Sequence, residues 1–430
     1  MSSDKDAQVG RMGNGVYYSK DLGKSVCVVT NGCSENQIDC AKMQEFFTKN
    51  AWSVTTDFRE ADIILFNSCG LTTVREDDSL EVLQAINVQK KPSAEVIIWG
   101  CFPRINIERI SEAHRGIIFK SHEAEHLEEF FEGNIKAHGI QANFLVPPLK
   151  SPHRKRKTLR RLSDITHIRS FIQRPFESRR WRCASDLVSF VDPDAFCIKV
   201  STGCLDACSY CGVRLSRGRL KSKPIDSIMA EFKKGLDKNF RKFTLIGTDL
   251  GAYGRDQGTN LIALLNALFK NEGDYKLRLP NINPRWLTEM MPELRELVKS
   301  RKINVIGAGA QSGSNRILRL MNRRYRIEDY KESMFALKSE FPGLRLRTNI
   351  IVGFPSETEQ DFQKTVQLLN EVDFTFADIH RYAPRPKAKA ATMIDQIPRE
   401  VTEDRFTRLQ LLFSRRLRET RLGMLGAHRF

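Results

Sequence analysis

The sequence predicts an α/β protein in which an open parallel sheet is followed by a partial barrel of six strand–helix units. Short apolar runs rich in β-branched residues alternate with helical patterns over residues 24–133. The same alternation resumes at residue 195 and continues through six units. Hydrophobic residues make up 41% of the 430 residues, which is ordinary for a globular chain of two or three domains.

The first half contains four expected strands, and helical patterns such as ENQIDCAKMQEFFTKN follow them. These strands carry the runs SVCVVTNG, ADIILFNSC, EVIIWGC and RGIIFK. Because a helix separates each strand from the next, the strands are expected to lie parallel in one open sheet.

The second half contains six further expected strands, separated by helical patterns such as PIDSIMAEFKKGLDKN. They carry the runs AFCIKVSTG, FTLIGTDL, YKLRLPNI, INVIGAGA, LRLRTNIIVGFP and FTFADIHRYAP. Six consecutive units of this kind predict a partial (β/α)6 barrel whose site lies at the carboxyl ends of its strands.

These patterns divide the chain into five expected segments. They are a flexible tail over 1–23, an N-terminal α/β domain over 24–140, a basic linker over 141–194, the barrel over 195–398, and a C-terminal helix and tail over 399–430.

The formal net charge is +17, and residues 150–182 alone contribute +10 of it. Such a segment either binds a polyanion through counterion release or is a solvated linker. No run of about 18 apolar residues is present, and the polar N-terminus lacks a secretory signal. We therefore expect no membrane span, a cytoplasmic location and few disulfides among the ten cysteines.

Three cysteines of the first half occupy equivalent positions. Cys33, Cys69 and Cys101 each lie at or just past the carboxyl end of an expected strand. Parallel strands end at one edge of their sheet, so these side chains can converge there. Cys27 lies within a strand and Cys40 within a helix, and for both we expect simple packing.

Three more cysteines, Cys204, Cys208 and Cys211, form a C-x3-C-x2-C loop after the first barrel strand. A zinc site would need a fourth ligand, and no further C-x2-C pair lies nearby. The loop resembles that of the radical S-adenosylmethionine (SAM) enzymes. This resemblance implies a [4Fe-4S] cluster whose open iron binds SAM, reductive cleavage of SAM to a 5′-deoxyadenosyl radical, and Tyr210 near the adenine.

A narrower resemblance covers residues 24–420, interrupted by the basic linker. Seven segments of the chain are similar to those of the methylthiotransferase family. They are TNGCSENQIDC, ADIILFNSCGLTTVRE, IIWGCFPR, GRLKSKP, GAQSGSNRILRLMNRRY, TNIIVGFPSETEQDF and RYAPRPKAKAATM. This resemblance implies a second [4Fe-4S] cluster on Cys33, Cys69 and Cys101. It also implies insertion of sulfur and a methyl group into a C–H bond of the substrate.

The resemblance implies a tRNA adenosine beside the anticodon as substrate, with a protein or ribosomally made peptide as the alternative. It also implies an electron donor such as flavodoxin or ferredoxin. The basic segment agrees with a polyanionic partner. The family's C-terminal TRAM barrel is expected to be missing, which favours the alternative substrate. The segment IGAGAQSGS also lacks the family's usual histidine and proline, a departure that affects the expected SAM or substrate contacts nearby.

Further candidate residues follow from position alone, and the sequence assigns no catalytic residue. Asp249, Gln311 and Asn349 lie at expected strand ends, where each could contact SAM or substrate, or serve as a turn or capping residue. The segment HEAEH, from His122 to His126, matches the H-E-x-x-H zinc pattern but lacks further ligands, and an exposed charged helix is the favoured interpretation.

Overall fold

The computed structural model of the chain describes residues 18, 23–120, 127–150, 192 and 194–427. The described residues form two compact units. The described residues of the first lie within Met1–Leu205, Cys211–Thr248 and Arg385–Lys387, and those of the second lie within Asp206–Tyr210, Asp249–Pro384 and Ala388–Phe430. No described helix combines the length and the apolar character needed to cross a membrane.

The first unit begins with an open parallel sheet in the strand order β2-β1-β3-β4. Its elements are β1 (Ser25–Thr30), α1 (Ser34–Lys49), β2 (Ser53–Val54), β3 (Ile63–Ser68), α2 (Thr73–Gln89), β4 (Glu95–Gly100), α3 (Cys101–Ile105), α4 (Ile107–Ala113), and the short 3-10 helices η3 (Glu128–Phe130) and η4 (Ala137–Gly139). Three of the four expected strands are thereby confirmed, and the two-residue β2 is added.

The fourth expected strand, RGIIFK, does not form. Ile118 makes only a single parallel bridge to Ile98. The Ile98 N–H donates to the Ile117 carbonyl at 2.9 Å, and the Ile98 carbonyl accepts from the Phe119 N–H at 2.8 Å. The apolar run correctly predicted burial, since Ile118 packs into the core. Its single bridge to Ile98, however, is too short to form a strand.

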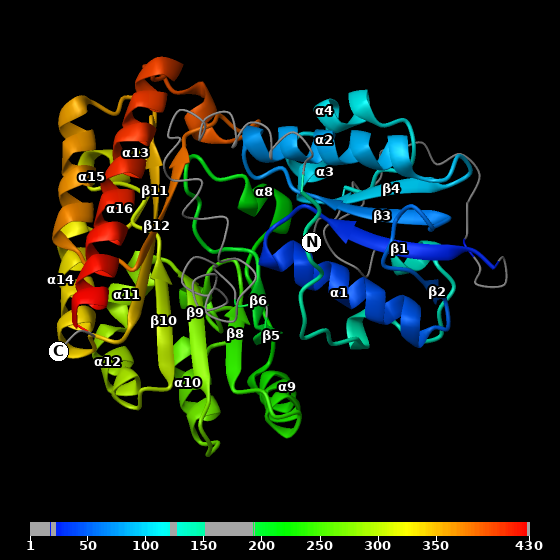
Figure 1. The fold of residues 1–430 in the computed structure, drawn as a ribbon, viewed down its shortest axis with the longest axis horizontal. Coiled ribbons are helices and arrows are strands. Elements are labelled where there is room, and N and C mark those ends of the chain that lie inside the picture. Colours follow the sequence, from blue (N-terminus) through cyan, green and yellow to red (C-terminus); the bar gives the residue numbers. More distant parts are fainter. Residues whose placement is uncertain (1–17, 19–22, 121–126, 151–191, 193, 428–430) are drawn as a thin grey trace. The chain divides into compact units, whose positions relative to one another are not determined.

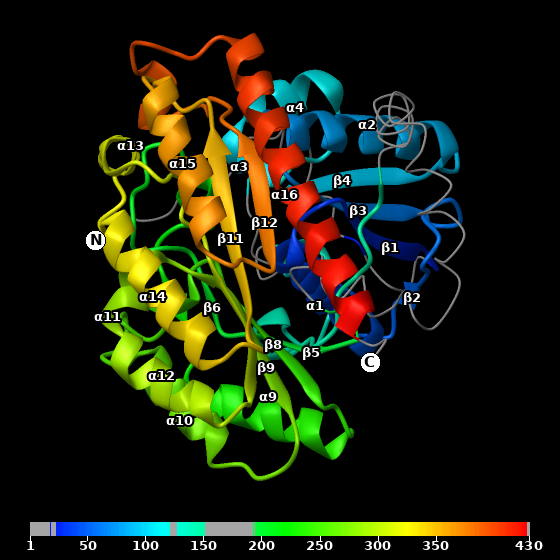
Figure 2. The same cartoon turned by 60° about the vertical axis from the view of Figure 1, so that its left-hand side comes forward.

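Helices cover both faces of this sheet, with α1 on one face and α2 on the other (Figures 1 and 2). Val26 and Val28 of β1 pack into the core that includes α1, while Cys27 and Val29 pack into the core that includes α2. Burial on both faces explains why the strands read as continuous apolar runs. Cys27 and Cys40 are buried packing residues, as expected.

The first unit also contains the first two strands of the second half, β5 and β8, which pair in parallel. Its remaining elements are β5 (Phe196–Lys199), β6 (Ser201–Thr202), α8 (Val213–Arg217), β7 (Lys221–Ser222), α9 (Ile225–Asp237) and β8 (Lys242–Ile246). The short strands β6 and β7 form an antiparallel pair that the sequence did not predict.

The second unit contains the other four expected strands, parallel in the order β12-β11-β10-β9. Its elements are η5 (Leu250–Ala252), α10 (Leu261–Phe269), β9 (Lys276–Ile282), α11 (Pro284–Glu289), α12 (Met291–Lys299), β10 (Ile303–Ala308), α13 (Asn315–Leu320), α14 (Ile327–Glu340), β11 (Arg345–Val352), α15 (Glu359–Glu371), β12 (Phe376–Arg381), η6 (Lys389–Thr392) and α16 (Arg399–Ala427). The six strand–helix repeats of the predicted barrel class are present.

A buried ion pair joins the loop after β11 to α16, which runs beside β11 and β12 in both views (Figures 1 and 2). The Arg405 guanidinium donates to Glu357 Oε2 at 2.9 Å, and the Gly353 N–H donates to the same oxygen at 2.8 Å. The side chain of Glu357 is fully buried, and its Oε1 has no hydrogen-bond partner. Burial raises the pKa of Glu357 to about 7, although Gly353 and Arg405 act in the opposite direction.

The raised pKa of Glu357 predicts a pH-dependent stability of the second unit. Because the folded state binds the proton more tightly than the unfolded state, the stability present near pH 4.5 is lost as pH rises towards 7. The loss amounts to at most about 3 kcal/mol. Amide hydrogen exchange of α15 and α16 at pH 5.5 and pH 8 measures it. In Glu357→Gln the stability is expected to change little with pH, whereas the control Glu359→Gln, at an exposed site, retains the pH dependence. The same change of stability with pH in both variants would contradict its assignment to Glu357.

Candidate functional site

The three cysteines of the first sheet lie at its carboxyl edge. Cys33 is the N-cap of α1 just after β1, Cys69 directly follows β3, and Cys101 directly follows β4 as the first residue of α3. Because β1, β3 and β4 are adjacent parallel strands, their chain ends bring three thiols to one edge.

Asn36 connects two of these thiols. Its Oδ1 lies 3.6 Å from Cys33 Sγ and 3.6 Å from Cys101 Sγ, so the two sulfurs are at most about 7 Å apart. Burial raises the pKa of the Cys69 thiol to about 12, and Cys33 and Cys101 raise it further by charge repulsion. All three thiols therefore interact electrostatically at this edge.

A glycine adjoins each of the three cysteines, and two of them show how closely the backbone packs there. Gly100, which precedes Cys101, has φ 100°, and a Cβ on it would lie 2.3 Å from Asn67 Oδ1. A Cβ on Gly70, which follows Cys69, would lie 2.7 Å from the Cα of Phe102. A side chain at either position would displace the backbone that carries a cysteine.

A buried arginine lies beside this edge. Arg217, the last residue of α8, donates from Nη1 to Asp39 Oδ2 at 2.9 Å and from Nη2 to Asn36 Oδ1 at 2.7 Å. Its Nη1 also lies 3.4 Å from a carboxylate oxygen of Glu35. Sequence reasoning missed this group, although Glu35, Asn36 and Asp39 are polar residues with helical spacing on α1 that immediately follow Cys33.

A second buried arginine holds the loop after Cys69. Arg385 donates from Nη1 to the Gly70 carbonyl at 3.2 Å and to Glu76 Oε1 at 2.7 Å, and from Nη2 to the Thr73 hydroxyl. Its side chain is 4% exposed and that of Glu76 is 2% exposed, so the ion pair is largely removed from solvent. The segment RYAPRPKAKAATM thus contributes directly to the geometry of the cysteine edge.

The cysteines of the second triad are placed by local hydrogen bonds. In the first unit, Cys211 Sγ accepts from the Val213 N–H at 3.3 Å, and the Cys204 N–H donates to the Gly218 carbonyl at 3.3 Å. In the second unit, Arg323 Nη1 donates to Cys208 Sγ at 3.6 Å and its Nη2 donates to the Gly309 carbonyl at 3.0 Å.

Tyr210 packs within the second unit rather than projecting freely. Its ring meets Phe354 edge-on at 6.4 Å between centroids, in an apolar cluster that includes Ile317 and Met321. This environment gives the ring a fixed orientation, which suits the aromatic packing role expected for it.

Asp249 is occupied by protein donors. Its Oδ1 accepts the N–H groups of Gly251 and Asn283, each at 3.1 Å, and its Oδ2 accepts the indole N–H of Trp286 at 3.1 Å. Burial raises its pKa to about 6. Of the two alternatives left open by the sequence, these contacts favour the capping role, in which Asp249 begins η5.

Gln311 and Asn349 are joined through their backbones. The Gln311 N–H donates to the Asn349 carbonyl at 2.7 Å, and the Gln311 carbonyl accepts from the Ile351 N–H at 2.9 Å. Gln311 has φ 67°, a conformation that is unfavourable for a side-chain-bearing residue and is often retained at functional sites. Asn349 lies within β11, three residues before its end at Val352, rather than at the expected strand end.

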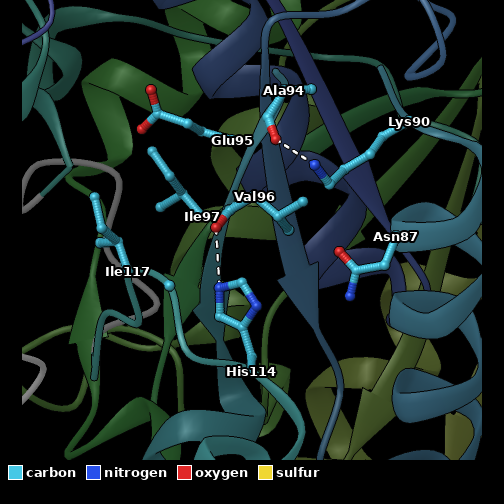
Figure 3. Close-up of a pocket in the computed structure, with 9 residues that line it drawn as sticks. Asn87, Lys90, Ala94, Glu95, Val96, Ile97, His114 and Ile117 are labelled. Carbon is cyan, nitrogen blue, oxygen red and sulfur yellow. Dashed lines mark hydrogen bonds between the residues drawn. The ribbon is translucent and has the colours of Figure 1, made fainter. Parts of the chain in front are cut away.

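A cavity of about 260 Å³ lies elsewhere in the first unit, near the start of β4 and thus at the opposite end of that strand from Cys101 (Figure 3). Two of the polar side chains that line it bind backbone carbonyls of the same unit. His114 Nε2 lies 3.0 Å from the Val96 carbonyl, and Lys90 Nζ donates to the Ala94 carbonyl at 2.5 Å.

Some sequence features lie outside the described residues. They are the HEAEH segment, with His122 and His126, the basic segment from residue 151 onward, and Cys183. Among the residues that the structure describes, no group of three or more His, Cys, Asp or Glu side chains is already converged to hold a metal ion.

The sequence comparisons cover both halves of the chain. Residues 198–369 match the radical SAM superfamily, and residues 25–119 match uncharacterized protein family UPF0004. The threonylcarbamoyladenosine tRNA methylthiotransferase MtaB of Thermotoga maritima is 30% identical over 388 residues, which are 89% of this chain and 80% of that protein. This chain belongs to the radical SAM methylthiotransferase family. It is therefore an enzyme with two [4Fe-4S] clusters and SAM as cofactors.

Other relatives in the methylthiotransferase family give the same level of similarity. The tRNA-2-methylthio-N(6)-dimethylallyladenosine synthase of Acetivibrio thermocellus is 30% identical over 93% of this chain and 79% of that protein. The human threonylcarbamoyladenosine tRNA methylthiotransferase is 30% identical over 91% of this chain and 62% of that protein. Among solved structures, the radical SAM methyltransferase TsrM of Kitasatospora setae has a TM-score of 0.53 at 12% identity, covering 86% of this chain and 77% of that chain, which supports the fold alone.

The described residues fit the donor set that such clusters require. Cys33, Cys69 and Cys101 place three thiols at one edge, and three thiolates would leave one iron of a four-iron cluster open. Asn36 and Arg217 provide a polar and cationic flank, which suits a cluster of thiolates and sulfides better than an apolar core would.

The close packing of Gly100 predicts that Gly100→Ala destabilises the first unit by about 2 kcal/mol or more, since the new Cβ meets Asn67 and the backbone keeps a positive φ. Gly139→Ala is the matched control, because nothing lies within 4 Å of its Cβ, and its effect stays within about 0.5 kcal/mol. Urea titrations followed by circular dichroism measure both. Equal stability of the two variants would contradict the packing described.

Proposed function

We propose that this enzyme methylthiolates tRNA, at an adenosine beside the anticodon that already carries an N6 substituent. The relatives named for tRNA methylthiotransfer support this choice, since their names give threonylcarbamoyladenosine and N(6)-dimethylallyladenosine as the nucleosides. The observation that carries the proposal is the gathering of Cys33, Cys69 and Cys101 at one sheet edge, in a chain that also holds the C-x3-C-x2-C loop. The protein or peptide substrate is not favoured by these relatives.

We assign the ligands accordingly. Cys33, Cys69 and Cys101 hold the auxiliary cluster, and Cys204, Cys208 and Cys211 hold the cluster that binds SAM. When bound, the two clusters and SAM would supply the radical chemistry and the sulfur and methyl groups. The chain's own residues orient these groups, since Arg323 donates to Cys208 and Asn36 lies against Cys33 and Cys101.

SAM recognition is assigned to polar and aromatic groups near the ends of the barrel strands. Tyr210 presents a fixed aromatic ring for the adenine, and the strained Gln311 and its backbone partner Asn349 present amide groups. Asp249 supports this region indirectly by holding Asn283 and Trp286 in place.

The remaining assignments concern partners and boundaries. The enzyme requires an electron donor such as flavodoxin or ferredoxin, and we place its action in the cytoplasm, where tRNA is available. The divisions at residues 24–140, 141–194 and 195–398 are proposed as functional domains, with the basic linker as an RNA-binding arm.

The two-cluster assignment predicts the iron content of anaerobically reconstituted protein. The wild-type chain is expected to contain about eight irons, and the combined variant Cys33→Ala/Cys69→Ala/Cys101→Ala about four. Cys27→Ala/Cys40→Ala removes two packing thiols of the same unit and serves as the control, with about eight irons. About four irons in the wild-type chain, unchanged by the triple substitution, would exclude the second cluster.

The substrate assignment predicts the nucleosides of tRNA from a deletion strain. Mass spectrometry is expected to show loss of a 2-methylthio-adenosine derivative and accumulation of the same N6-modified nucleoside without the methylthio group. Complementation with the wild-type gene restores the product, whereas the Cys208→Ala gene does not. An unchanged methylthio-nucleoside profile in the deletion strain would reject tRNA as the substrate.

A further inference from the structure

Arg217 is a buried cation at the cysteine edge of the first unit. Its side chain is 2% exposed, and it reaches Asn36, whose Oδ1 accepts from Nη2 at 2.7 Å and lies 3.6 Å from the sulfurs of both Cys33 and Cys101. One amide oxygen thus separates the guanidinium from two proposed cluster ligands.

The surrounding charges fix this guanidinium in its ionised form. Burial by itself would lower the pKa of Arg217, but the pKa is raised well above its usual value by the negative groups around it. The groups that raise it are, in decreasing order of effect, Glu35, Cys101, Asp39 and Cys33, and the two cysteines act in this way only as thiolates. The cation is therefore coupled to the cysteines as well as to the carboxylates.

The two carboxylates have other partners, which limits how far they neutralise Arg217. Lys199 Nζ donates to Asp39 Oδ1 at 2.6 Å, while Arg217 takes Asp39 Oδ2. The Thr248 hydroxyl lies 3.0 Å from Glu35 Oε2. Arg217 and Lys199 are the cations of this group, and of the two it is Arg217 that reaches Asn36, the residue that lies against Cys33 and Cys101.

We propose that Arg217 is a positioning residue that sets the reduction potential of the auxiliary cluster. This inference rests on the assignment of that cluster to Cys33, Cys69 and Cys101. Adding one electron makes the cluster more negative, and a nearby buried cation stabilises that state, because the interaction is poorly screened away from water. Arg217 therefore raises the potential, and Asp39, by partly neutralising Arg217, lowers it.

The position of Arg217 in the chain gives this arrangement a second consequence. Arg217 follows Cys211 by six residues, at the end of the short helix that continues from the C-x3-C-x2-C loop. The segment that carries ligands of the SAM-binding cluster thus also supplies the charge that acts on the auxiliary cluster. One short stretch of sequence serves both clusters.

The experiment is a redox titration of the anaerobically reconstituted full-length protein, followed by electron paramagnetic resonance. The signal that changes when SAM is added belongs to the SAM-binding cluster, and the other signal reports the auxiliary cluster. Arg217→Gln is expected to lower the auxiliary potential, so that its reduced-to-oxidised ratio at a fixed applied potential falls about tenfold, equivalent to about 59 mV for one electron. Arg217→Lys retains the charge and restores most of the potential.

Two further variants separate charge from structure. Arg219→Gln removes the same charge from an exposed residue two positions away, and its auxiliary potential is expected to match the wild type. Asp39→Asn is expected to shift the potential in the opposite direction, towards less negative values. A purely structural disturbance would not shift the auxiliary potential in opposite directions in the Arg217→Gln and Asp39→Asn variants.

The outcomes distinguish this inference from the cluster assignment on which it rests. If iron analysis finds one cluster only, the assignment of the auxiliary cluster fails. If two clusters are present and Asp39→Asn leaves the auxiliary potential unchanged, the role of Arg217 is overturned. This outcome decides the question even if the Arg217→Gln protein fails to retain its iron. Equal potentials in Arg217→Gln and Arg219→Gln would overturn it as well.

Discussion

The cysteine edge of the first sheet depends on Asn36, a buried amide in the first turn of α1. Its Nδ2 donates to Asn67 Oδ1 at 2.6 Å, and its Oδ1 accepts from Arg217 and lies against Cys33 and Cys101. A buried amide is stable only when its donor and acceptor are both satisfied. Asn36 therefore couples β3, α1 and α8 into one polar arrangement around the thiols.

Much of this arrangement follows from rules that act locally. Strand ends in a parallel sheet share an edge, so the positions of Cys33, Cys69 and Cys101 relative to their strands could be predicted from apolar runs alone. The three-cysteine loop was equally predictable, because its spacing is fixed within eight residues. The family resemblance then supplied a role that no single motif could have given.

The parts that could not be predicted depend on contacts between distant residues. In the sequence, Arg217 is one of several arginines in a basic stretch. Only the structure shows that it is buried against Asp39, 178 residues earlier. RGIIFK has the composition of a strand, yet pairs at Ile118 only. Asp249 has the position of a ligand contact, but its oxygens are taken by N–H groups that only the folded chain brings together.

The contacts of Arg385 have a consequence for biosynthesis. This residue donates to the Gly70 carbonyl and Glu76, which precede it by 315 and 309 positions. The loop after Cys69 therefore gains these hydrogen bonds only once residue 385 has been translated. Contacts of such long sequence separation are slow to form, because the intervening chain must first be closed into a loop. The loop that follows Cys69 thus completes this set of hydrogen bonds only after the barrel strands have been synthesised.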